Sequence, residues 1–161
     1  MKVYFDNAAT TRVRDEVVHE ISDLLKNCFG NPSSTHSFGR SSKSYIERSR
    51  KSIAKILNCE PGEIIFNSGG TESDNSILKC AVKDLGVKHI ISSKIEHHAI
   101  TYNLDEIEKT GIKVSYVSLN NQGEIDVNSL EKLLKINNES TLVTLMYINN
   151  EIGNILDIKS V

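Results

Sequence analysis

The chain has 161 residues, of which 39% are hydrophobic and 25% are charged, and its formal net charge is −2. This balance provides no basic surface for nucleic acid, and no apolar run reaches the roughly 18 residues that a membrane-spanning helix needs. The first residues also lack the apolar stretch of a secretory signal, so we expect a cytoplasmic protein with no nucleic-acid or membrane partner.

Residues 1–60 are expected to form an N-terminal arm with two helices. A polar loop at 6–11 precedes apolar residues that recur every three or four positions over 17–25, the spacing of an amphipathic helix. A second helix is predicted over 41–57, and a polar loop at 30–40 joins the two.

Residues 61–161 are expected to form an α/β domain. Strand-like segments at 64–66, 89–91, 114–119 and 141–148 alternate with helical patterns at about 71–84, 98–109 and 126–134. Such alternation is typical of a mainly parallel sheet with flanking helices, in which ligands bind at the carboxyl ends of the strands.

The first candidate site is a glycine loop, Ser68-Gly69-Gly70-Thr71, between a predicted strand and a helix. Glycines let the backbone approach an anion, and unpaired amides at a helix start favour phosphate. Thr71 and Asp74 also match a capping box that would begin the helix at this point. The loop has neither a Walker motif nor GxGxxG, and a tight turn with a capped helix is the alternative.

Two further polar clusters follow predicted strands. In Glu96-His97-His98, a histidine can stack on a flat ring or move a proton near neutral pH. In Asn149-Asn150-Glu151, an asparagine amide can donate to a phenolate-like oxygen. The alternatives are a surface histidine at a helix start and an ordinary turn. No third ligand has a suitable spacing, so we expect no metal site.

Three cysteines, Cys28, Cys59 and Cys80, are widely spaced and form no CxxC pair. We therefore expect reduced, half-buried thiols and no structural zinc.

Five segments, in this order, resemble one family. They are Tyr4–Thr11, Gly30–Ser34, Phe66–Asn75, Glu96-His97 and Asn149–Gly153. Together they are similar to the NifS/IscS-type cysteine desulfurases, which are class V aminotransferase-like enzymes with the pyridoxal 5′-phosphate (PLP) fold of type I. The resemblance covers the chain from end to end, and it implies the first half of the large PLP domain after an arm that belongs partly to the small domain.

The resemblance also implies roles for individual residues. Gly70 and Thr71 would hold the PLP phosphate, and His97 would stack on the pyridine ring and assist proton transfer. Asn150 would donate a hydrogen bond to the phenolic oxygen of the ring. Asn7 and Ala8 would lie near the substrate.

The activity implied is removal of sulfur from L-cysteine, which gives alanine and an enzyme persulfide for iron–sulfur cluster or tRNA thiolation pathways. The family enzyme is a homodimer that passes sulfur to a scaffold or another acceptor protein. Its Schiff-base lysine and nucleophilic cysteine are expected beyond Val161, so this chain alone would be inactive. The alternatives are a selenocysteine lyase, another class V PLP enzyme, or a non-catalytic truncated or split interaction module.

Overall fold

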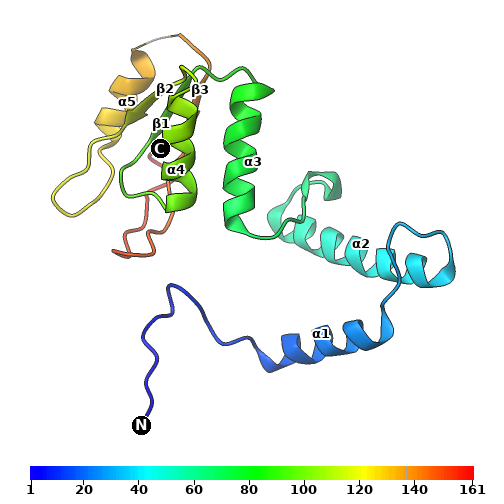
Figure 1. Ribbon diagram of the computed structural model, residues 1–161. Coiled ribbons are helices and arrows are strands. Elements are labelled where there is room, and N and C mark those ends of the chain that lie inside the picture. The colour runs from blue at the N-terminus through cyan, green and yellow to red at the C-terminus, as the bar shows by residue number, and fades with distance from the viewer. Residues whose placement is uncertain (137) are drawn as a thin grey trace. The chain divides into compact units, whose positions relative to one another are not determined.

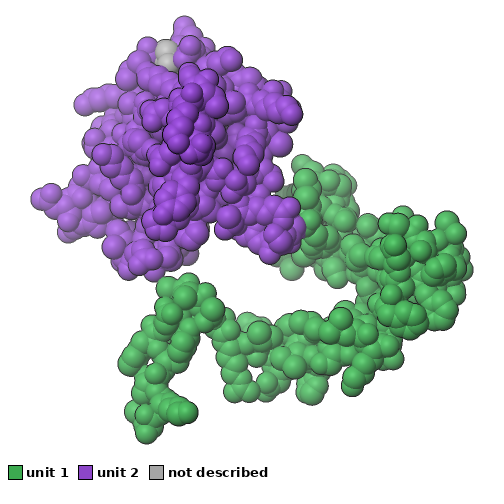
Figure 2. All heavy atoms as spheres, in the orientation of Figure 1, with its two compact units in different colours: residues 1–66 green, residues 67–161 purple. Residues whose placement is uncertain are grey.

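The computed structural model describes residues 1–136 and 138–161. The chain divides into two compact units, residues 1–66 and residues 67–161 (Figure 2). The sequence placed this boundary between residues 60 and 61, a few positions earlier.

Unit 1 contains the helices α1 (Asp15–Asn27) and α2 (Ser37–Leu57) and the short 3₁₀ helix η1 (Pro61–Glu63) (Figure 1). α2 begins four residues before the predicted start because His36 caps it, its Nδ1 accepting a hydrogen bond from the Gly39 amide at 3.3 Å. A Cβ atom on Gly39 would lie only 2.4 Å from the Ser34 carbonyl oxygen, so this close packing requires glycine.

The predicted strand at 64–66 is wrong, since these residues form no strand. The Ile64 carbonyl accepts a hydrogen bond from the Arg50 guanidinium, which also lies 4.9 Å from the centre of the Phe66 ring. Ile65 is 81% exposed. An apolar run becomes a strand only where another strand pairs with its backbone, and here a side chain of α2 occupies the Ile64 carbonyl instead.

The described residues of unit 2 form three helices and three strands, which confirms the predicted α/β architecture. In chain order they are α3 (Gly70–Lys83), β1 (His89–Ser92), α4 (His98–Glu108), β2 (Lys113–Tyr116), α5 (Val127–Lys135) and β3 (Thr141–Val143). The strands form a fully parallel sheet in the order β2-β1-β3. The described residues hold three strands where the sequence predicted four, and the last strand ends at Val143 and not at Ile148.

Helices cover both faces of this sheet. Ile90 belongs to a core cluster that contains Leu78 of α3 and Leu104 of α4, whereas the adjacent Ile91 packs with Leu130 of α5. This alternation follows from the two-residue period of a strand. A strand of a parallel sheet that is covered on both faces has apolar residues at successive positions. This explains why Ile90 and Ile91 are adjacent in the sequence.

The order β2-β1-β3 places the carboxyl ends of β1 and β3 side by side. The chain passes from β1 through α4 to β2 on one side of β1, and then through α5 to β3 on the other side. Such a reversal of strand order opens a crevice at the strand ends. Figure 1 shows the first turns of α3 and α4 at the same end of unit 2 as the segment that follows β3.

Candidate functional site

A cavity of about 280 Å³ lies beyond the carboxyl ends of β1 and β3. It is lined by Lys94, Ile95, Glu96, His97, His98, Asn149, Asn150, Glu151 and Ile152. The structure thus brings together the two polar clusters that the sequence singled out after separate strands. Residues 68–71 are not among those that line the cavity, and Asn7 and Ala8 belong to unit 1.

His97 is the N-terminal cap of α4. Its Nδ1 accepts a hydrogen bond from the Ala99 amide at 3.1 Å, which leaves Nε2 as the nitrogen that carries the proton in the neutral ring. The residue is exposed, so the face of the imidazole is accessible. His98, by contrast, stacks on Tyr102 with 4.9 Å between the ring centres. The His97 ring lies 6.2 Å from the His98 ring and is tilted by 49° to it, so of the two histidines His97 offers the unstacked ring.

Asn149 and Asn150 differ sharply in their surroundings. Asn149 is buried, and its side chain accepts hydrogen bonds from the Glu151 and Ile152 amides and donates one to the Ile95 carbonyl. Asn150 is exposed, and its amide makes one described side-chain bond, 3.0 Å to the adjacent Glu151 carboxylate. Asn150 is thus the member of the pair that is free to donate to a ligand.

Glu96 joins the two walls of the cavity, a role the sequence did not reveal. Its Oε1 accepts hydrogen bonds from the Ser93 hydroxyl and the Met146 amide, both at 2.8 Å. Burial raises the pKa of the Glu96 carboxyl, the two hydrogen bonds oppose this, and the nearby Asp74 carboxylate raises it further. The one signal in the sequence was its position directly before His97.

The glycine loop precedes α3, which begins at Gly70 with Gly69 as its cap. The predicted capping box on Thr71 and Asp74 is wrong, because Thr71 lies inside the helix. Instead the Glu72 carboxylate accepts hydrogen bonds from the Ser68 amide at 2.7 Å and the Ser68 hydroxyl at 2.6 Å, and these bonds lower the pKa of Glu72.

This arrangement leaves donors at the start of α3 for an anion. The amides of Gly70 and Thr71 and the Thr71 hydroxyl make no hydrogen bond with any described part of the chain. Gly69 has φ +158°, a conformation that residues with side chains rarely adopt, and a Cβ on Gly69 or Gly70 would meet nothing within 4 Å. The loop is therefore open, and its donors suit a phosphate group.

The other residues that the sequence raised have simpler surroundings. Asn7 and Ala8 are exposed in a turn in which the Asp6 carbonyl accepts from the Ala9 and Thr10 amides. The three cysteines are free, and Cys80 is exposed, where we expected half-buried thiols. Over residues 1–136 and 138–161, no group of acidic, histidine or cysteine side chains is arranged to hold a metal ion. Within the same ranges, no helix has the length and apolar character of a membrane span.

A parallel α/β layer with a phosphate-type loop and a polar crevice at its strand ends defines a cofactor- or substrate-binding domain. Residues 3–161 match the family Aminotransferase class-V, so this chain belongs to that family. Class V aminotransferases depend on PLP, and the chain's residues fit that cofactor. The open donors at Gly70 and Thr71 suit its phosphate, and the unstacked ring of His97 and the exposed amide of Asn150 suit its pyridine ring and phenolic oxygen.

Curated relatives include a cysteine desulfurase IscS of Dictyoglomus turgidum, which is 44% identical over 96% of this chain and 39% of its own length. Another cysteine desulfurase IscS, from Methanosarcina thermophila, is 42% identical over 99% of this chain and 39% of its own length. The chain thus spans about two fifths of the length of these relatives.

Solved structures of related proteins have the same fold as this chain. A NifS-like protein is 38% identical, with a TM-score of 0.93 over 99% of this chain and 44% of that one. SspA, solved in complex with cysteine, is 32% identical, with a TM-score of 0.88 over 98% of this chain and 45% of that one. The fold is therefore that of the N-terminal part of a PLP enzyme of fold type I.

Proposed function

We propose that this chain forms the cofactor-binding part of a cysteine desulfurase, which removes sulfur from L-cysteine and releases alanine. The observation that carries the proposal is the cavity in which the exposed His97 and the exposed Asn150 meet, in a chain that matches cysteine desulfurases over nearly its whole length. Residues 61–161 would supply the first half of the PLP domain, and residues 1–60 would contribute to the small domain and the dimer.

The geometry of each residue supports its proposed role. The Gly70 and Thr71 amides would donate to the phosphate at the positive end of α3. The His97 ring would stack on the pyridine face, with its Nδ1 held by Ala99 and its Nε2 free to move a proton. The Asn150 amide would donate to the phenolic oxygen. When bound, PLP supplies an electron sink for the carbon next to the substrate amine.

The partners are also part of the proposal. We expect L-cysteine as substrate, a homodimer as the assembly, a cytoplasmic location, and an iron–sulfur scaffold or another acceptor protein as the recipient of the sulfur. Asn7 and Ala8 would lie near the substrate. Support comes from relatives named cysteine desulfurase and from the related SspA, which was solved with cysteine.

The proposal is tested on the protein as its source cells contain it, captured with an antibody raised against this chain. With PLP and a thiol reductant to supply the two electrons, we expect L-cysteine to yield alanine and sulfide in equal amounts. Release of alanine from L-selenocysteine but not from L-cysteine would indicate a selenocysteine lyase instead. No alanine from either amino acid would refute the proposal.

A further inference from the structure

We propose that Glu96 and Asn149 are positioning residues that hold His97 and Asn150 at the spacing a flat aromatic ring requires. The inference rests on the proposed function, and it assigns roles to two side chains that face the protein and not the ligand. Each lies directly before one of the proposed ligand-binding residues in the chain.

Regular sheet bonding ends just before the cavity begins. The last paired residues of β1 and β3 are Ile91 and Val143, and the Thr144 amide donates to the Ile91 carbonyl. Beyond this point the two chain segments would be free to separate, as loops outside a sheet commonly do. Interactions other than the hydrogen bonds of the sheet must therefore set the distance between the two walls of the cavity.

Glu96 provides the first cross-link. Its Oε1 accepts a hydrogen bond from the Met146 amide, 50 positions away in the sequence, and another from Ser93 in its own loop. Hydrogen bonds to an ionised carboxylate are stronger than neutral ones. Burial of this half-exposed carboxyl raises the pKa of Glu96, and its two hydrogen bonds oppose the shift by stabilising the charged form.

Asn149 provides the second cross-link, in the opposite direction. Its Nδ2 donates to the Ile95 carbonyl at 2.7 Å, while its Oδ1 accepts from Glu151 at 2.9 Å and from Ile152 at 3.0 Å. Asn149 is therefore held by three hydrogen bonds, and only 5% of its surface is exposed. The two bonds therefore join residues 95–96 to residues 146–149 at two adjacent points.

Four variants separate positioning from general stability. Glu96→Ala removes the first cross-link, whereas Glu96→Gln keeps an acceptor oxygen and should rescue it. Asn149→Asp keeps the acceptor for Glu151 and Ile152 but loses the donor to Ile95. Asn154→Asp is the matched control, because Asn154 donates to the Gln122 carbonyl at 2.7 Å and does not line this cavity.

The probe is pyridoxine 5′-phosphate, which has the ring, phenolic oxygen and phosphate of PLP but no aldehyde to react with lysines. Binding to the 161-residue chain is followed by nuclear magnetic resonance of the His97 ring and the residue 146 and 150 amides. Glu96→Ala and Asn149→Asp should weaken binding about tenfold, the effect of one lost hydrogen bond. Glu96→Gln and Asn154→Asp should stay within about twofold of the wild type.

Hydrogen exchange provides the second readout. The Met146 amide should exchange faster in Glu96→Ala and be protected again in Glu96→Gln. Equal binding by all four variants and the wild type would overturn the positioning role and leave the proposed function intact. If the wild-type chain does not bind the probe, hydrogen exchange alone decides the positioning role, and equal exchange of the Met146 amide in Glu96→Ala and the wild type would overturn it.

Discussion

The two units of this chain differ in how their helices are stabilised. Of the buried hydrophobic residues in the described parts of the chain, Ala54 alone lies in unit 1. Every residue of α1 is exposed or half-exposed, including its apolar Val17, Ile21 and Leu25. In unit 2, by contrast, the helices lie beside the sheet (Figure 1). The apolar residues of α3, α4 and α5 are buried in clusters with residues of the sheet.

This difference shows why the candidate site belongs to unit 2. α1 has the periodicity of an amphipathic helix but buries none of its residues, and a side chain is held at a defined position only when its backbone is anchored to a packed core. His97 follows β1 and caps α4, both of which contribute to the core. Asn7 and Ala8 have no such anchor within unit 1, where they lie in an exposed turn.

The largest expected effect is a difference in lost stability when one leucine is shortened in each unit. Leu104 of α4 is fully buried, so Leu104→Ala should lower the free energy of unfolding by about 3 kcal/mol through lost burial and a residual cavity. Leu25 of α1 is 76% exposed, and Leu25→Ala should cost less than about 0.5 kcal/mol. Urea denaturation followed by circular dichroism measures both, and equal losses would contradict the comparison.

A smaller effect is expected at the helix starts. Asp126 caps α5 by accepting a hydrogen bond from the Asn128 amide at 2.9 Å, so Asp126→Ala should cost about 1 kcal/mol. Arg14 occupies the equivalent position before α1 and makes no capping bond with its side chain, so Arg14→Ala should be nearly neutral. The same denaturation experiment checks the pair, and a larger loss for Arg14→Ala would show that α1 is stabilised by contacts other than its own.

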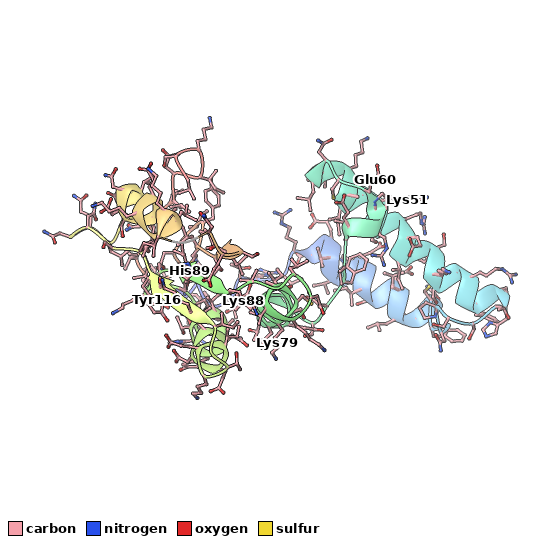
Figure 3. All side chains as sticks on the ribbon, turned by 90° about the horizontal axis from the view of Figure 1, so that it is seen from above. Lys51, Glu60, Lys79, Lys88, His89 and Tyr116 are labelled. Atoms are coloured by element: carbon pink, nitrogen blue, oxygen red, sulfur yellow. The ribbon has the colours of Figure 1, made fainter. Side chains whose placement is uncertain are left out.

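The smallest expected effect is a pH dependence that arises in unit 2. His89 lies on β1 (Figure 3) and is fully buried. Its Nε2 lies 2.8 Å from the Ser115 hydroxyl, and its Nδ1 has no hydrogen-bond partner among the described residues. Burial lowers the pKa of His89 below its usual 6.5, Lys113 lowers it further, and Glu139 opposes the shift.

Because this pKa is lower in the folded state, protons bind preferentially to the unfolded chain. The stability that His89 contributes should be present above about pH 6.5 and decrease as the pH falls below it. Denaturation midpoints between pH 8 and pH 5 should therefore depend less on pH in His89→Gln than in the wild type. His19→Gln, at an exposed position on α1, should keep the wild-type slope, and a flattened slope there would argue against His89 as the cause.

Much of the fold and site could be predicted from local signals. The helical pattern at about 126–134 predicted α5, and the structure confirms this helix at Val127–Lys135, with Asp126 as its cap. The clusters at His97 and Asn150 were singled out because polar residues after apolar runs stand at strand ends, and these two do line one cavity. The strand predicted at 64–66 failed because strand formation depends on a partner, which a local pattern does not show.

The sequence by itself determined the family, the α/β class, the helices and the residue types that suit a phosphate and an aromatic ring, since periodicity, caps and ordered motifs are local properties. The resemblance implied roles for His97 and Asn150, but only the tertiary structure gave a physical reason why these members of each pair are available. Asn149 makes three hydrogen bonds to the protein, whereas the exposed Asn150 makes one side-chain bond, to Glu151. His98 stacks on Tyr102, whereas His97 does not. The cross-link from Glu96 to Met146 was equally invisible, because it joins segments 50 positions apart that meet only after β1 and β3 pair.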